Sequence, residues 1–217
     1  MHIRYICEQN SILNHFLTQI RDVTIQKDSM RFRKNIERIG EIMAYELSKT
    51  LEYKEIQVQT PLGIKETTTI ADNVVLCSIL RAGLALHQGF MNFFDDAENG
   101  FVSAYRHHYN HDDSFEILVE YQAAPSFHNK NLILIDPMLA TGQSIVAVLK
   151  KLHLEQKPKE IHIAVVIAAP EGIAYLRENL PENCHLWVAA CDENLNEKNY
   201  IVPGLGDAGD LAYGSKL

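Results

Sequence analysis

The stretch Leu132–Ile145, LILIDPMLATGQSI, places an apolar run, an aspartate, a turn of small residues and a helix start in succession. This order is typical of a strand–turn–helix unit whose turn faces a ligand. The backbone N–H groups of residues 140–143 and the hydroxyls of Thr141 and Ser144 could converge on a phosphate at the helix start. Asp136, at the end of the predicted strand, could accept hydrogen bonds from ribose hydroxyls. An ordinary N-capped turn without a ligand is the alternative interpretation.

Similar apolar runs alternate with helical patterns along the chain. They lie at Val74–Leu80, Phe101–Ala104, Leu132–Ile135, Ile161–Ile167 and His185–Ala190. Short apolar strands that alternate with helices indicate a mainly parallel sheet buried on both faces. Residues 11–53 show the apolar spacing of helices, with Asp28 and Ser29 as a helix start. The sequence therefore predicts an α/β fold, with one domain over residues 1–217 and an N-terminal helical part.

The composition limits the classes of partner and location. The 217 residues contain 47% hydrophobic residues and carry a formal net charge of −8, which disfavours a broad nucleic-acid interface. The four cysteines have no paired metal spacing, and Cys77 and Cys191 lie in apolar runs that we expect to be buried strands. No segment approaches the ~18 apolar residues that suggest a membrane span. We therefore expect reduced core thiols, no membrane contact and a cytoplasmic location.

A second candidate ligand loop follows another predicted strand. The segment Ile79–Leu84, ILRAGL, places Arg81 at the strand end, and Gly83 would let the backbone approach a ligand closely. The planar guanidinium of Arg81 suits a pyrophosphate because it can make paired hydrogen bonds to phosphate oxygens. A salt bridge at the sheet edge is the alternative interpretation of Arg81.

A third candidate loop lies near the C-terminus. The segment Tyr200–Gly214, YIVPGLGDAGDLAYG, contains four glycines, one proline and two aspartates. If ordered, such a loop could present backbone N–H and C=O groups to a planar ligand such as a pyrimidine. A disordered tail is the alternative, although apolar residues such as Ile201 and Leu205 could anchor the segment.

The segment Phe115–Tyr121 alternates apolar and polar residues after a polar turn, which predicts half of an exposed β-hairpin. This hairpin, at about residues 105–125, is a candidate flap. The arrangement of His107, His108 and His111 invites a metal interpretation, but these side chains lack a cysteine or carboxylate partner on a predicted helix. A solvated turn is therefore the preferred interpretation.

These three ligand segments strongly resemble the uracil phosphoribosyltransferase family. The strings DPMLATG (Asp136–Gly142), ILRAG (Ile79–Gly83) and PGLGDAGD (Pro203–Asp210) match the motifs of that family, and the AAPEG turn at Ala168–Gly172 is also similar. The resemblance implies a type I phosphoribosyltransferase fold: a mainly parallel sheet flanked by helices, with a β-hairpin flap and a C-terminal hood. It also implies transfer of the phosphoribosyl group of phosphoribosyl pyrophosphate (PRPP) to N1 of uracil, which yields UMP and diphosphate.

The resemblance assigns roles by position. Arg81, Arg106 and Asp207 are the implied catalytic residues, and Asp207 is also implied in both binding sites. The remaining implied PRPP-binding residues are Asp136, Pro137, Met138, Leu139, Ala140, Thr141, Gly142, Gln143 and Ser144. The remaining implied uracil-binding residues are Ile201, Gly206 and Ala208.

The implied cofactor is Mg²⁺, held mainly through PRPP with Asp207 as a water-mediated partner, and the implied assembly is a homodimer or higher homo-oligomer. GTP is a candidate effector. Gln143 stands where the family commonly has a second glycine, which is harmless only if that residue has an ordinary φ. Two alternatives remain open. One is a non-catalytic regulator that senses PRPP or nucleotide on the same fold, and the other is a purine phosphoribosyltransferase, which the GLGDAGD loop disfavours.

Overall fold

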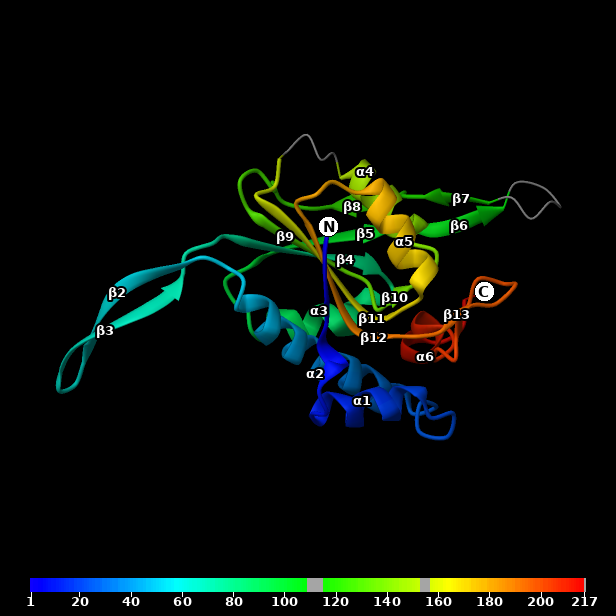
Figure 1. Ribbon diagram of the computed structural model, residues 1–217, viewed down its shortest axis with the longest axis horizontal. Helices are drawn as coiled ribbons and strands as arrows, with labels where there is room; N and C mark the ends of the chain where they lie inside the picture. Colours follow the sequence, from blue (N-terminus) through cyan, green and yellow to red (C-terminus); the bar gives the residue numbers. More distant parts are fainter. Residues whose placement is uncertain (109–114, 153–156, 217) are drawn as a thin grey trace.

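A computed structural model of the chain describes residues 1–108, 115–152 and 157–216, and side chains are described except at 106–108, 115 and 116. Its centre is an eight-stranded sheet (Figure 1). The strands follow the order β1 (His2–Tyr5), β12 (Cys184–Cys191), β11 (Glu160–Ala168), β9 (Asn131–Ile135), β4 (Val74–Leu80), β5 (Glu98–Ser103) and β8 (Gln122–Ala123), and β10 (Met138–Leu139) pairs with β11. All pairs are parallel except that of β5 with β8. The predicted mainly parallel sheet is confirmed, and the sequence missed the edge strand β1.

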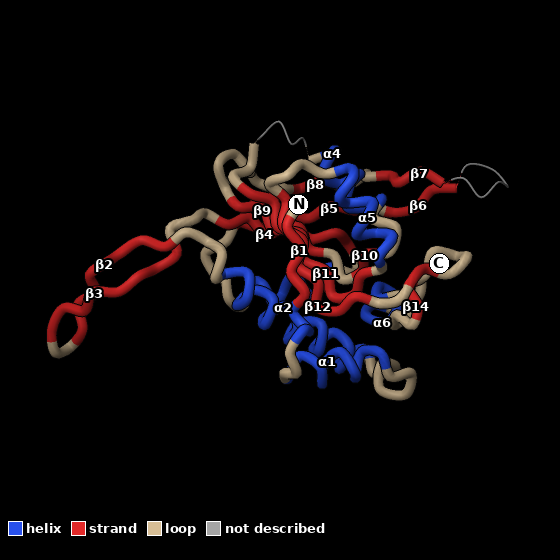
Figure 2. The backbone as a smooth tube through the Cα atoms, in the orientation of Figure 1, coloured by secondary structure: helices blue, strands red, loops and turns tan. Residues whose placement is uncertain are grey.

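Helices cover both faces of this sheet (Figure 2). They are α1 (Ile12–Arg21), α2 (Ser29–Ser48) and α3 (Gly83–Met91) on one face, and α4 (Gln143–Lys151) and α5 (Pro170–Asn179) on the other, with η1 (Ile6–Glu8) and α6 (Ala208–Tyr213) completing the described helices. Two apolar clusters result, one on each side of the sheet. The alternation of strand and helix along the chain therefore gives the three layers expected of an α/β fold.

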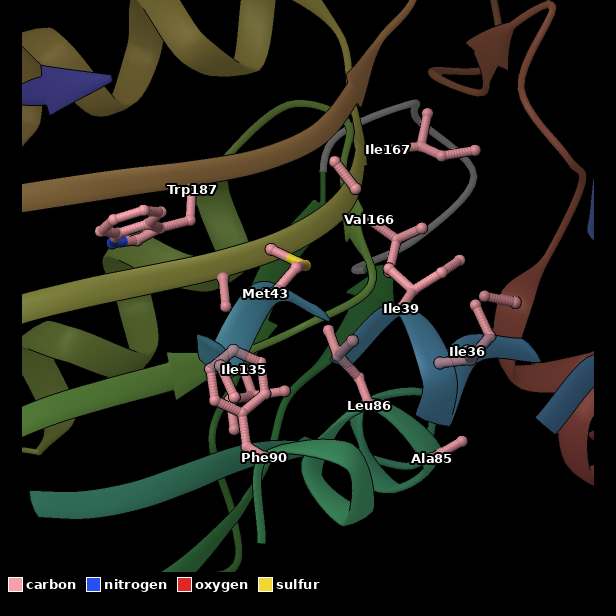
Figure 3. Packing of buried hydrophobic residues seen from close by; sticks show 14 of the residues in the cluster. Ile36, Ile39, Met43, Ala85, Leu86, Phe90, Ile135, Val166, Ile167 and Trp187 are labelled. Carbon is pink, nitrogen blue, oxygen red and sulfur yellow. The ribbon is translucent and has the colours of Figure 1, made fainter. Parts of the chain in front are cut away.

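In the layer of α1, α2 and α3, the apolar residues that recur along α2 pack against the sheet and α3. The Asp28 side chain accepts a hydrogen bond from the Arg31 backbone N–H, which confirms the predicted start of α2. In Figure 3, Ile39 and Met43 of α2 point between the sheet and the apolar side chains of α3. Helices α2 and α3 approach closely at Gly89, where an added Cβ would lie 2.1 Å from the Glu37 carbonyl oxygen. This packing fixes α3, and hence the loop that precedes it, against the sheet.

A long β-hairpin projects from the body of the molecule, at the left of Figure 1. It consists of β2 (Tyr53–Thr60) and β3 (Gly63–Ile70), paired in an antiparallel register. No strand was predicted here, and the predicted helical part reached residue 53, whereas α2 ends at Ser48. The reason is that most side chains of both strands are solvent-exposed, so no core-facing alternation marks them as strands.

The hairpin predicted at about residues 105–125 is present in the described residues. Strands β6 (Tyr105–His108) and β7 (Phe115–Leu118) pair antiparallel. The strand predicted to reach Tyr121 ends at Leu118, and the chain then enters β8. His111 lies outside the described residues, as do the side chains of His107 and His108, so the solvated-turn interpretation stays a prediction.

The cysteines correct one expectation. Cys77 and Cys184 are buried, whereas Cys191 is exposed, so the predicted burial of Cys191 is wrong. It is the last residue of β12, where the strand leaves the covered part of the sheet. All four thiols are free. In the described part of the chain, no helix combines the length and apolar character needed to cross a membrane.

Candidate active site

A cavity of about 540 Å³ lies at the carboxyl ends of the central strands. Twelve of the residues assigned by resemblance line it: Arg81, Asp136, Met138, Leu139, Ala140, Thr141, Gly142, Ser144, Ile201, Gly206, Asp207 and Ala208. They come from three segments far apart in the sequence, which the parallel sheet brings to one edge. Ligands of open α/β sheets bind at this edge because the loops that follow parallel strands converge there.

The candidate phosphate loop, residues 136–144, contains Gly142 and the start of α4. Gly142 has φ +80° and is the N-cap of the helix, and an added Cβ would lie 3.0 Å from the Gly172 carbonyl oxygen. Gln143 is the first residue of α4 and is not one of the described residues with positive φ. The substitution of the family's common glycine by Gln143 is therefore free of backbone strain. Thr141 and Ser144 line the cavity beside the positive end of the helix.

Among the assigned residues whose side chains are described, two do not line the cavity. The carbonyl oxygen of Pro137 accepts hydrogen bonds of 3.0 Å from both Val166 and Ile167, so its only backbone polar group serves the sheet. The side chain of Gln143 is also outside the lining.

Asp136 is the carboxylate at the end of β9. Burial raises the pKa of Asp136 to about 7, the backbone N–H of Met138 opposes this shift with a hydrogen bond of 3.3 Å, and the negative charge of Asp207 adds to it. A pair of carboxylates that share one cavity disfavours ionisation of the more buried member. Asp136 is therefore poised to lose its proton when a ligand supplies hydrogen bonds or positive charge.

Arg81 follows β4 and faces the end of the chain. Its Nη2 donates to Asp210 Oδ1 at 3.1 Å and its Nη1 donates to the Gly214 carbonyl oxygen at 3.2 Å. The salt bridge considered as an alternative for Arg81 is thus present, although the same side chain also lines the cavity. Arg106 belongs to β6, where it pairs with Ile117, and its side chain is outside the described part.

The C-terminal loop is ordered, contrary to the disordered-tail alternative. Strand β14 (Ile201–Val202) pairs with β13 (Asn194–Leu195), and Ile201 and Leu205 are buried. Gly206 has φ +94°, and the next residue, Asp207, caps α6 by accepting a hydrogen bond from the Asp210 backbone N–H at 2.9 Å. The loop therefore contributes residues to the cavity lining and leads into a short helix that packs against the core.

Several lining residues were missed from the sequence: Tyr105, Asn199, Tyr200 and Lys216. Tyr105 and Tyr200 directly precede assigned residues, so their position next to the motifs was the available signal. Asn199 has φ +60°, which no sequence pattern indicated. Lys216 follows α6 near the end of the chain, and only the tertiary structure places it at the cavity.

Comparisons with known proteins show which family the chain is similar to. The family model described as "Uracil phosphoribosyltransferase" matches residues 7–215. A protein named uracil phosphoribosyltransferase from Porphyromonas gingivalis is 51% identical over 217 residues, which is all of both chains. A protein of the same name from Thermococcus gammatolerans is 40% identical over 98% of this chain and 94% of its own.

Solved structures support the fold. The AQ2163 protein from Aquifex aeolicus has a TM-score of 0.87 at 30% identity, and the match covers 98% of each chain. A hypoxanthine phosphoribosyltransferase from Staphylococcus aureus has a TM-score of 0.51 at 16% identity, over 86% of this chain and 84% of its own. The second likeness bears on the fold alone, and it identifies that fold as the type I phosphoribosyltransferase architecture.

Proposed function

The chain belongs to the uracil phosphoribosyltransferase family, an enzyme family of transferases, and we propose how its cavity performs the reaction of that family. That reaction transfers the phosphoribosyl group of PRPP to N1 of uracil and releases diphosphate, with UMP as the product. One observation carries the assignment of residues: the phosphate loop, Arg81 and the C-terminal loop line a single cavity. The 5′-phosphate and ribose, the pyrophosphate and the uracil base can therefore all bind in this one cavity.

PRPP would lie across the carboxyl ends of β9 and β4. Its 5′-phosphate would sit at the start of α4, where backbone N–H groups and the hydroxyls of Thr141 and Ser144 can donate to it. Asp136 would accept hydrogen bonds from the ribose hydroxyls. The pyrophosphate would extend toward Arg81, with Arg106 as the proposed second cation.

Uracil would lie under the C-terminal loop. Backbone groups of Ile201, Gly206 and Ala208 would pair with the alternating donors and acceptors on the edge of the base. Gly206 supports this role because its positive φ turns the backbone, and no heavy atom lies within 4 Å of where its Cβ would be. A purine is larger than uracil, so its binding would require this loop to move away from the cavity.

The chemical step needs no nucleophilic side chain. N1 of uracil would attack C1 of the ribose as the C1–O bond to pyrophosphate breaks, so positive charge builds on the sugar while the leaving group carries the electron pair. The proton of N1 would pass to an oxygen of the departing pyrophosphate. Arg81 and Arg106 would stabilise the departing charge, and the loops would hold N1 and C1 in line. Closure of the β6–β7 hairpin over the cavity would exclude water.

A divalent cation fits the donor set of this cavity. Asp136 and Asp207 lie close enough for one charge to raise the pKa of the other, and hard oxygen ligands suit Mg²⁺. The described residues contain no cluster of three His, Cys, Asp or Glu side chains that could hold a metal without substrate. Bound Mg²⁺ would be held mainly by PRPP oxygens, with Asp207 as a water-mediated partner, and would neutralise the charge of the leaving group.

Assembly into a homodimer is also proposed. The β2–β3 hairpin exposes Val58, Leu62 and Ile64, and an arm with exposed apolar residues suits contact with a second copy. Light scattering after gel filtration tests this, because a monomer at assay concentrations would contradict it. Activation by GTP and location in the cytoplasm stay predictions, and the first is tested by adding GTP to the assay below.

The deciding experiment is a radiolabelled-uracil assay with purified protein, PRPP and Mg²⁺, with cytosine, hypoxanthine and orotate as competing bases. PRPP-dependent UMP formation that the other bases do not suppress is expected. PRPP binding without product from any base would contradict the proposal and favour the regulator, which none of the relatives reported above supports by name.

A further inference from the structure

The two ends of α6 both contact Arg81. Asp210, in the first turn of the helix, holds Nη2, and Gly214, just after its last residue, holds Nη1. We propose that Asp210 is a positioning residue that orients Arg81 toward the pyrophosphate of PRPP and couples Arg81 to the proposed base-binding loop. This inference rests on the proposed pyrophosphate role of Arg81. No motif match pointed to a role of this kind for Asp210.

The position of Asp210 favours orientation over competition with the substrate. Arg81, Asp207 and Gly209 line the cavity, whereas Asp210 is not among the described lining residues. The carboxylate therefore reaches the guanidinium from outside the cavity. Because α6 engages one N–H of each terminal nitrogen, Nε–H and the two remaining terminal N–H groups are left for phosphate oxygens.

The same helix fixes where the carboxylate lies. The Asp210 backbone N–H donates to Asp207 Oδ1 at 2.9 Å, and the Gly214 N–H donates to the Asp210 carbonyl oxygen at 2.9 Å. On the far side, Arg33 of α2 donates to the Ala212 carbonyl oxygen at 2.6 Å. Both contacts of Arg81 thus belong to a helix whose first turn is part of the proposed base site.

This arrangement links the two substrates. A base that orders the loop at Asp207 and Ala208 also fixes the start of α6, and therefore the carboxylate that aims Arg81. Uracil should then favour PRPP binding, and PRPP should favour uracil binding by the same factor. Breaking the Asp210–Arg81 contact should weaken this coupling without removing either binding site.

The test is the Asp210→Asn variant, which keeps the size of the side chain and the backbone N–H that α6 needs. The ion pair is more than one-third exposed on both partners, so solvent limits its effect, and the KM for PRPP should rise about fivefold. The affinity of the PRPP-free protein for uracil should change less than twofold, whereas the KM for uracil at saturating PRPP should rise because the coupling is weakened. Asp96→Asn removes an exposed negative charge elsewhere and is the matched control.

Two further measurements separate orientation from a loss of structure. Calorimetry with Mg²⁺-pyrophosphate should show the same fivefold weakening in Asp210→Asn, and Asp210→Glu, which retains the charge, should restore part of the affinity. In an Arg81→Met background, Asp210→Asn should cause no additional loss, because the contact is already gone. If Asp210→Asn folds poorly, the calorimetric affinity of Asp210→Glu for Mg²⁺-pyrophosphate is compared with that of the wild type. A weaker affinity in a well-folded Asp210→Glu supports the proposal, because the longer side chain moves the carboxylate, and an unchanged affinity contradicts it.

Defined results would overturn the proposal. An unchanged or lower KM for PRPP in Asp210→Asn would show that the contact is inert or that it competes with substrate. Equal losses in the wild-type and Arg81→Met backgrounds would show that Asp210 acts on the fold and not through Arg81. Failure of the wild type to form UMP would instead contradict the proposed function of the cavity. The pyrophosphate affinities would still show whether Asp210 orients Arg81.

Discussion

Arg21 and Asp192 form a two-pronged ion pair that holds the backbone of Gly204. Arg21 Nη2 and Nη1 lie 2.5 and 2.8 Å from the two carboxylate oxygens, and Nη1 also donates to the Gly204 carbonyl oxygen at 2.9 Å. The Gly204 N–H donates to the same carboxylate at 2.8 Å. The end of α1 thus fixes the turn at Gly204 in the proposed base-binding loop, residues 200–214.

Arg21→Met should damage the base site and the fold together. Asp192 is 5% exposed, so removing its partner leaves a buried, partly unpaired carboxylate, and we expect a loss of roughly 2–4 kcal/mol of unfolding free energy. The KM for uracil should rise more than the KM for PRPP. Urea unfolding and steady-state kinetics measure both effects.

The double variant Arg21→Met with Asp192→Asn is the control for this prediction. It removes the orphaned charge and should recover part of the lost stability, but not the affinity for uracil. A single variant as stable as the wild type would show that the ion pair contributes little.

PRPP binding should release a proton near neutral pH. The pKa of Asp136 is raised to about 7 in the free protein, mainly by burial. Hydrogen bonds from ribose hydroxyls favour the ionised carboxylate, so binding should lower this pKa and affinity should rise as pH increases from 6 to 8. Calorimetry in two buffers of different ionisation enthalpy measures the released proton.

Asp136→Asn isolates the contribution of the protein, because phosphate groups also titrate in this range. Proton release should fall in this variant by the amount that Asp136 supplies. Identical release in wild type and variant would contradict the assigned role.

Gly142→Ala should impair PRPP binding. At φ +80° an alanine is strained by about 1–2 kcal/mol, and its Cβ would crowd the Gly172 carbonyl oxygen at 3.0 Å. Relief of this strain moves the start of α4, so the KM for PRPP should rise about tenfold. Gly100→Ala, which crowds Ala124 far from the phosphate loop, controls for packing loss alone: it should lower the melting temperature with little change in KM.

His162 should make the protein sensitive to acid. It is fully buried and accepts a hydrogen bond from Trp187 at its Nδ1, while His185, Glu160, Arg4 and Asp72 act on it electrostatically. Burial is the main reason that its pKa falls to about 3, below the ordinary 6.5.

The folded state therefore resists protonation of His162, and stability that is present above pH 6.5 is lost as pH falls toward 3. His162 should account for up to about 1.4 kcal/mol of unfolding free energy per pH unit in that window. His162→Leu should flatten this dependence, as urea unfolding between pH 4 and 7 would show, and an unchanged slope would contradict the prediction.

The strands and ligand loops could be predicted because their sequence patterns are local. The run Val74–Leu80 coincides with β4, and the turn after Ile135 leads into α4 as expected. The β2–β3 hairpin could not be predicted, because solvent faces both sides of it and no apolar alternation forms.

Long-range contacts were the other limit. The pairs Arg21–Asp192 and Arg81–Asp210 join residues 171 and 129 positions apart, and nothing in the local sequence of one partner identifies the other. The motifs identified the loops at the cavity, whereas the side chains that hold those loops in place follow only from the tertiary structure.

The contacts of α1 and α2 with the last segment also set an order of events during synthesis on the ribosome. Arg21 can form its hydrogen bond to the Gly204 carbonyl oxygen only after residue 204 has been synthesised. Arg33 likewise can donate to the Ala212 carbonyl oxygen only after residue 212, so these contacts of α1 and α2 form when the chain is nearly complete. A nascent chain that stops before residue 200 contains every described strand of the central sheet but lacks the proposed base-binding loop. The proposed base site is therefore completed last, so incomplete chains should not transfer the phosphoribosyl group of PRPP to uracil.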